Sequence, residues 1–74
     1  MKLSELEKGD RATILKVDTD DSLKSRLLSF GVARGSELTI EACSLGKQTI
    51  EIMVDDTLIG LRGEEAKKIE VEKI

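Results

Sequence analysis

The sequence predicts a mostly β fold with one or two short helices, arranged as a small barrel of about five strands with a helical insertion after the first strand. Two observations support this prediction. Short segments in which apolar and polar residues alternate are separated by turn residues, and one longer segment repeats leucine at helical spacing. The chain has 74 residues, which suffice for one domain but not for two, so we expect a single domain over residues 1–74.

The first strand is expected near residues 12–17, after a short helical turn. Leu3 and Leu6 are spaced like one face of such a turn. The apolar residues of the strand that follows are Ala12, Ile14 and Val17. Because these change from even to odd positions, we expect a bulge or a strong bend near Leu15 and Lys16, which would help a small barrel to close.

A helix is predicted from about Asp21 to Phe30. Its apolar residues recur at helical spacing or beside it, and they are Leu23, Leu27, Leu28 and Phe30. The Asp-Thr-Asp-Asp-Ser run at residues 18–22 supplies several candidate N-cap oxygens. Gly31 lies where a glycine in the left-handed conformation would end the helix.

Four more strands are expected after the helix. Inward and outward residues alternate over segments 38–43, 50–55 and 69–72, and a further strand is expected over residues 58–62, after the turn at residues 55–56. Residues 45–47 are the predicted hairpin turn, with Lys47 exposed at its tip, and Asp55-Asp56 form a second tight turn. Gly60 is interpreted as allowing a close backbone approach or a kink. Because a closed barrel leaves fewer exposed edges than an open sheet, the best description is an SH3-like barrel.

Three motifs occur in an order that is typical of a known family. The run from Arg26 to Gly35, R-L-L-S-F-G-V-A-R-G, resembles the signature R-L-x-x-x-G-(I/V)-x-x-G. Residues 3–9 resemble L-x-x-L-x-x-G, and residues 59–62, I-G-L-R, resemble I-A-L-R. Over nearly its whole length the chain therefore resembles FeoA, the ferrous iron transport protein A family. It departs from the family pattern at Arg34, where proline is frequent, and at Gly60.

The resemblance implies a partner and a function. It implies an SH3-like domain that acts in the cytoplasm beside FeoB, a membrane ferrous iron transporter with a G-protein domain, and that modulates the assembly or activity of this transporter by protein contact. An alternative is a free-standing regulatory interaction domain, since the C-terminal SH3-like domain of metal-dependent repressors is a related barrel. A weak homo-oligomer through an exposed strand also remains open.

Composition argues against several other classes of function. The chain has 12 basic and 15 acidic residues, interspersed, and only one aromatic residue, so no nucleic-acid partner is expected. No segment reaches the roughly 20 apolar residues of a membrane span, and no signal peptide is evident, so we expect a cytoplasmic protein without membrane insertion. The single cysteine cannot form an intramolecular disulfide, which fits a reducing compartment.

No catalytic, cofactor or metal site is expected. The chain has no histidine, so neither its serines nor Cys43 has an imidazole base, and we predict that it is not an enzyme. Cys43 lies out of phase with the apolar residues before it, which indicates a side chain that faces solvent. The adjacent acids Asp55-Asp56 and Glu64-Glu65 are interpreted as solvated surface rather than as metal ligands.

The predicted partner-binding surface lies at the end of the helix and in the loop that follows. Its residues are Arg26, Leu28, Phe30, Ala33 and Arg34. The helix carries more apolar side chains than one face can bury, and Leu28 departs from the stripe of Leu23 and Leu27. For Arg26 and Arg62, bracing of the fold is favoured over contact with a partner, and both roles remain open.

Overall fold

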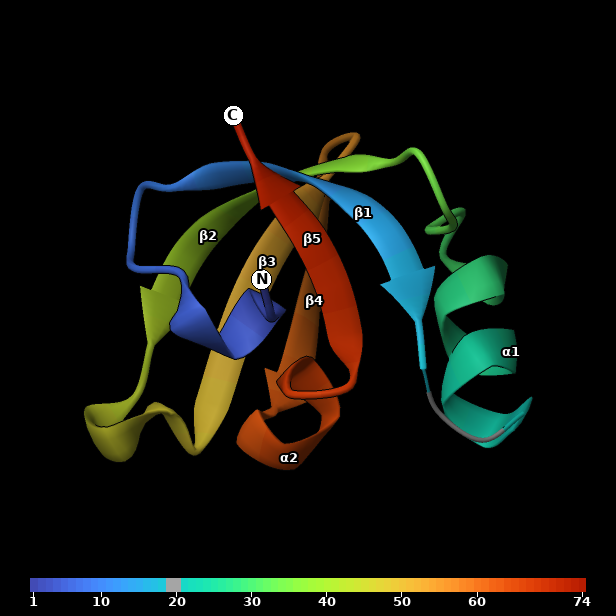
Figure 1. Cartoon of the computed structure of the whole chain (residues 1–74). Coiled ribbons are helices and arrows are strands. Elements are labelled where there is room, and N and C mark those ends of the chain that lie inside the picture. The colour runs from blue at the N-terminus through green and yellow to red at the C-terminus, as the bar shows by residue number, and fades with distance from the viewer. Residues whose placement is uncertain (19–20) are drawn as a thin grey trace.

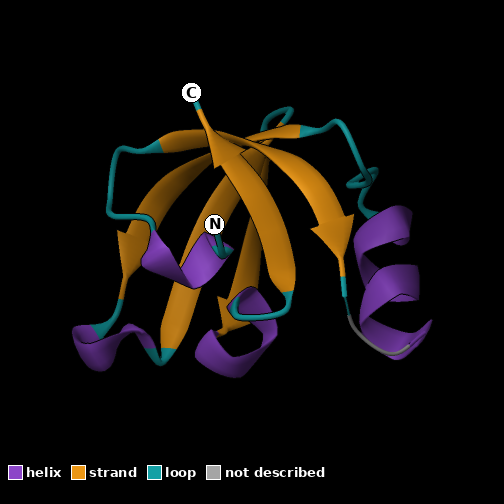
Figure 2. Ribbon diagram, viewed as in Figure 1, coloured by secondary structure: helices purple, strands orange, loops and turns teal. Residues whose placement is uncertain are grey.

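The computed structural model describes residues 1–18 and 21–74 and contains five strands, two short 3-10 turns and two helices (Figure 1). In chain order they are η1 (Leu3–Glu5), β1 (Arg11–Val17), α1 (Asp21–Ser29), β2 (Glu37–Cys43), η2 (Leu45–Lys47), β3 (Thr49–Val54), β4 (Thr57–Arg62), α2 (Gly63–Ala66) and β5 (Ile69–Lys73). Figure 2 shows the strands curling around one interior, with the helical segments at the periphery. The prediction of a mostly β fold with a helix inserted after the first strand is confirmed.

The strands form one antiparallel sheet in the order β4-β3-β2-β1-β5. The pairing of β1 with β5 shifts register between Ile14 and Lys16, which confirms the predicted bulge. The bulge directs Leu15 to the surface, whereas Ile14 is 1% exposed. At the other edge of β5 the N-terminal residues continue the pairing, since the Val71 backbone N–H donates to the Met1 carbonyl at 2.8 Å.

A second bulge in β2 reverses the expected orientation of Cys43. The pairing of β2 with β3 shifts register between Ile40 and Ala42, so Cys43 lies opposite Ile50. Ile50 is fully buried, and Cys43 is half-buried against the same core. The expectation that Cys43 faces solvent was therefore wrong, because simple alternation does not hold across a bulge.

The core is aliphatic, and none of the described residues places a polar or charged side chain in the buried class. Its members come from all five strands, from α1 and α2, and from the N-terminal turn. The largest side chains with less than 2% exposure are Leu3, Leu6, Ile14, Leu27, Leu38, Ile40, Ile50, Ile52, Leu61 and Ile69. Among the described residues, no helix combines the length and the apolar composition that a membrane crossing requires.

The turns on either side of β4 show where backbone geometry limits the sequence. Asp55 and Asp56 both have positive φ, 47° and 67°, as the predicted two-residue hairpin turn requires. Gly60 pairs with Glu51 in unbroken register, and a Cβ added there would meet nothing within 4 Å. The close approach expected at Gly60 occurs instead at Gly63, where an added Cβ would lie 2.3 Å from the carbonyl oxygen of Lys47.

Candidate functional site

Helix α1 presents one apolar face to the core and leaves two bulky apolar residues outside. Leu23 and Leu27 are buried, with 5% and 1% of their surface exposed. Leu28 is 62% exposed and Phe30, just after the helix, is 46% exposed. The expectation that Leu28 lies outside the buried stripe is confirmed, and both exposed residues belong to the predicted partner-binding set.

Paired backbone hydrogen bonds end α1 and set the course of the loop behind it. Gly31 has φ 80°, and its N–H donates to the Leu28 carbonyl at 2.9 Å. The Val32 N–H donates to the Leu27 carbonyl at 2.9 Å, which completes a Schellman motif and buries Val32 against the helix. The predicted capping function of Gly31 is confirmed. The predicted N-cap region includes residues 19 and 20, which lie outside the described residues.

A groove of about 550 Å³ separates α1 from the bulged end of β1. Its apolar lining residues are Leu15, Val17, Leu27, Leu28, Val32 and Ala33. Leu27 and Val32 are buried, whereas Leu15 and Leu28 keep 40% and 62% of their surface exposed. The groove therefore gathers the exposed apolar surface of two elements into one concave site.

Three basic residues complete the lining of this groove: Lys16, Lys24 and Arg34. All three are exposed, and the structure gives none of them an ion pair with a described residue. The basic side chains that do form ion pairs are Lys2, Arg11, Arg26, Lys47, Arg62 and Lys73. The groove is thus locally positive, although the chain carries a net charge of -3.

Arg26 and Phe30 do not line the groove, although both were predicted to bind a partner. The Arg26 guanidinium donates from Nη2 to Glu65 Oε1 at 2.9 Å, and the Arg62 backbone N–H donates to the same oxygen at 2.9 Å. Burial raises the pKa of Glu65, but these hydrogen bonds and the charge of Arg26 outweigh it and hold the pKa below its ordinary value. Arg26 therefore braces α1 against α2, as the bracing interpretation predicted.

The Arg62 side chain has no such structural contact. Its side chain is 79% exposed, and Nη1 of its guanidinium lies 4.0 Å from Oε1 of Glu64, whose side chain is 75% exposed. An exposed pair at this distance contributes little to stability. The bracing interpretation was wrong for this side chain, because the backbone N–H of Arg62, and not its guanidinium, makes the contact that holds α2.

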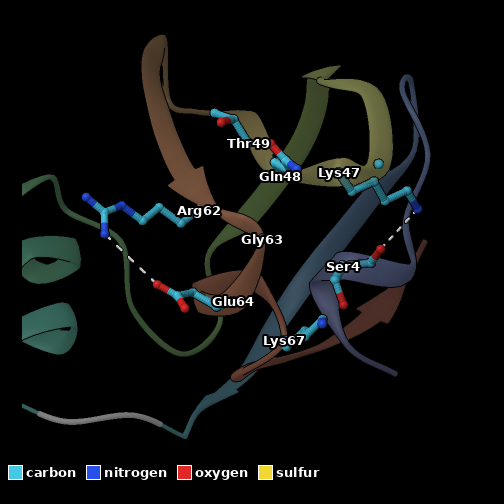
Figure 3. Close-up of a pocket in the computed structure, with 9 residues that line it drawn as sticks. Ser4, Lys47, Gln48, Thr49, Arg62, Gly63, Glu64 and Lys67 are labelled. Carbon is cyan, nitrogen blue, oxygen red and sulfur yellow. Dashed lines mark hydrogen bonds and ion pairs between the residues drawn. The ribbon is translucent and has the colours of Figure 1, made fainter.

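A second, polar hollow of about 630 Å³ lies between η1, η2 and the start of α2 (Figure 3). The side chains around it include Ser4, Arg62, Glu64 and Lys67, which extend from different elements in the close-up. Cations and a carboxylate share this lining, so the hollow has no single charge that would select a ligand. We therefore regard the groove beside α1 as the better candidate site.

Lys47, at the rim of the polar hollow, ties the hairpin to the N-terminal turn. Its Nζ donates to the Ser4 carbonyl at 3.0 Å, to the Leu6 carbonyl at 2.9 Å and to Glu7 Oε1 at 3.1 Å. Its side chain is 29% exposed. The prediction of an exposed tip residue was wrong, because the contact partners lie about 40 residues earlier and no local pattern indicates them.

The two acidic pairs that were considered as metal ligands lie at opposite ends of β4. Asp55 and Asp56 are exposed at the tip of the β3–β4 turn, whereas Glu65 is engaged by Arg26 at the other end of the strand. Within residues 1–18 and 21–74, no three His, Cys, Asp or Glu side chains come together in a way that could hold a metal ion.

The predicted partner-binding set lacked six of the residues that line the groove: Leu15, Lys16, Val17, Lys24, Leu27 and Val32. The bulge was a usable signal for Leu15, since a bulge that keeps both Ile14 and Val17 inward must turn the residues between them outward. No comparable signal existed for Lys24, because its place on the groove depends on how α1 lies against β1.

Comparisons with known proteins agree with this architecture. The model of the FeoA domain family matches residues 1–73. A putative Fe(2+) transport protein A of Campylobacter jejuni is 40% identical over 74 residues, which cover the whole of both chains. A fusion of Fe(2+) transport protein A with the Fe(2+) transporter FeoB in Porphyromonas gingivalis is 36% identical over 74 residues. This chain spans 9% of the length of that fusion protein.

Solved structures give the same result. The FeoA protein of Chlorobium tepidum superposes with a TM-score of 0.93 at 34% identity, over 100% of this chain and 70% of that one. A zinc-complexed FeoA of Stenotrophomonas maltophilia, described as an SH3 domain protein, superposes with a TM-score of 0.82 at 30% identity over 97% and 89% of the chains, which confirms the SH3-like barrel. The repressor IdeR of T. acidophilum, at a TM-score of 0.88 and 21% identity over 100% and 34%, shares the fold alone. The match over residues 1–73 and the identity across full-length relatives show that this chain belongs to the FeoA family.

Proposed function

We propose that this protein is a non-enzymatic accessory protein of ferrous iron uptake. It acts in the cytoplasm by binding the cytosolic part of a FeoB transporter, which modulates the assembly or activity of that transporter. The observation that carries the proposal is the Porphyromonas gingivalis relative, in which Fe(2+) transport protein A and FeoB are joined in one polypeptide. Such a fusion keeps the two parts at a high effective concentration, which favours a function that requires them to meet.

The candidate site supports binding rather than catalysis. The groove beside α1 offers aliphatic side chains and cations, which suit contact with another protein. Ferrous iron is the cargo of the transporter in this proposal, and this chain supplies a contact surface.

A second candidate is a free-standing regulatory domain that associates with a transcription regulator. The likeness to IdeR favours it, but at 21% identity this likeness concerns the fold alone. A relative that joins the domain to FeoB favours the transporter as partner.

Isothermal titration calorimetry with the soluble G-protein domain of the FeoB from the same organism tests the proposal. We expect binding with a dissociation constant in the micromolar range, and a different affinity in the GTP-analogue and GDP states if the domain modulates the nucleotide cycle. No binding at high micromolar concentration in either nucleotide state would refute the proposal. Binding to a transcription regulator under the same conditions would favour the second candidate.

A further inference from the structure

We propose that the groove between α1 and β1 captures an acidic amphipathic segment of the partner protein. One bulky apolar side chain of that segment rests on Leu27 and Val32, and carboxylates beside it pair with Lys16, Lys24 and Arg34. That the segment belongs to FeoB rests on the function proposed above. The chemistry of the segment rests on the groove itself.

Exposed aliphatic surface is concentrated in the groove. Leu15 and Leu28 are 40% and 62% exposed, and both line the same hollow. The buried side chains of Leu27 and Val32 also line it. A volume of about 550 Å³ is within the range of pockets that bind small ligands, roughly 300–1,000 Å³, so the groove has room for a bulky side chain. An occupant that removes this surface from water needs at least one bulky apolar residue.

Three cations surround the place that this apolar residue would occupy. Lys16, Lys24 and Arg34 come from β1, α1 and the loop after α1, so the fold brings them together from three separate segments. None has an ion pair within the described part of the chain, whereas six other basic residues do. Their aliphatic stems can lie along the groove while the charged groups stay at its rim. Carboxylates placed around an apolar anchor complement this arrangement.

The shape of the site favours a protein segment over a lipid surface. The exposed leucines line a concave groove, whereas binding to a bilayer requires apolar side chains that project from a convex face or from one side of a helix. A segment that inserts a single side chain between a helix and a strand fits a recess of this kind. An anionic membrane could pair with the three cations, but it would not fill the apolar groove.

Charge reversal in the labelled domain tests the proposal. The first variant, Lys24→Glu with Arg34→Glu, reverses the charge of the two groove cations that lie outside the sheet. The second variant, Leu28→Ser, removes one exposed apolar side chain from the lining of the groove. The matched control is Lys67→Glu with Lys68→Glu, because these residues are also exposed and form no ion pair with a described residue. All of the substituted side chains are exposed, so each variant is expected to keep the wild-type amide spectrum outside the groove.

The titrations use three probes: a helical peptide with leucines on one face and glutamates on the other, the same peptide with lysines for glutamates, and the FeoB G-protein domain. The wild type should bind the acidic peptide with amide shifts centred on residues 28–34. The groove variants should lose about tenfold or more in affinity, and the control pair should stay within about twofold of wild type.

The outcomes separate this inference from the proposed function. If the groove variants bind the G-protein domain as tightly as the wild type, the inference is overturned while the proposed function stands. If the wild type binds the acidic peptide in the groove but binds no G-protein domain, the proposed function fails and the groove chemistry is supported. Equal binding of the lysine peptide would overturn the inference. The inference would also be overturned if phosphatidylserine vesicles produced the same amide shifts in the groove. It would be overturned as well if these shifts depended on the concentration of the domain alone, because a second copy would then occupy the groove.

Discussion

Gly63 is the position where the addition of one methyl group should damage the fold most directly. A Cβ built on this residue lies 2.3 Å from the carbonyl oxygen of Lys47 and 3.4 Å from the carbonyl carbon. Ordinary van der Waals contact begins near 3.4 Å, so the two backbone segments must separate by about 1 Å. The atom in the way belongs to the backbone of η2 and cannot rotate aside as a side chain could. The hydrogen bond from the Gly63 N–H to the Gln48 carbonyl, 2.8 Å long, would be strained by the same movement.

The magnitude follows from these two terms. Overpacking costs about 1–3 kcal/mol, and a weakened backbone hydrogen bond adds about 1 kcal/mol. We therefore expect Gly63→Ala to lower the free energy of unfolding by about 2–4 kcal/mol. For a domain of this size the corresponding fall in Tm is on the order of 10–25 °C. The change also displaces Lys47, so the N-terminal turn should loosen with it.

Thermal and urea unfolding followed by far-UV circular dichroism measures this effect. The matched control is Gly60→Ala, three residues earlier, because this residue is exposed and an added Cβ meets nothing within 4 Å. This control should stay within about 0.5 kcal/mol of wild type, or gain slightly because the unfolded chain loses freedom. Should the two variants melt within about 3 °C of each other, the close contact with Lys47 does not constrain the fold and the reasoning is refuted.

Three further predictions concern side chains. Lys47→Met removes the ammonium group that holds the N-terminal turn, so it should lower the free energy of unfolding by about 1.5–3 kcal/mol. It should also speed amide hydrogen exchange in residues 3–7, and unchanged exchange there would contradict the prediction. The pKa of Glu65 is lowered by folding, so its carboxylate stabilises the fold above the unfolded pKa near 4.5 and this contribution is lost as pH falls through the folded pKa. Glu65→Gln should therefore lose less stability than the wild type between pH 7 and pH 3 in urea titrations, and equal losses would argue against the contact with Arg26. Leu27→Ala should cost about 2–4 kcal/mol and Leu28→Ala less than about 0.5 kcal/mol in urea unfolding, so similar costs would show that the burial assigned to α1 is incorrect.

The helix and the strands could be predicted from the sequence because their signals are local. The leucine spacing and Gly31 located α1 to within one residue at its end, and the change of apolar phase at Leu15 located the bulge in β1. The second bulge, between Ile40 and Ala42, left no such change in the apolar pattern. For this reason the orientation of Cys43 was predicted incorrectly.

The candidate site was predictable only in part. Of the five residues expected to bind a partner, Leu28, Ala33 and Arg34 line the groove, because helix periodicity and the cap at Gly31 place them on one side of α1. Arg26 is committed to Glu65, a residue far along the chain. The packing of the helices decides which carboxylate Arg26 contacts. The sequence around Arg26 does not indicate that carboxylate.

The amino-acid sequence by itself determined the family, the order of the elements and the residues that form the core, since motif order, hydrophobic periodicity and turn chemistry all act over a few neighbouring residues. Only the tertiary structure decided the contacts between distant segments. These are the contacts of Lys47 with the N-terminal turn, the requirement for glycine at position 63 and the meeting beside α1 of three cations that have no ion pair within the described residues. Each depends on the distance between two backbone segments, and packing elsewhere in the molecule sets that distance. The order of residues along the chain does not contain this information.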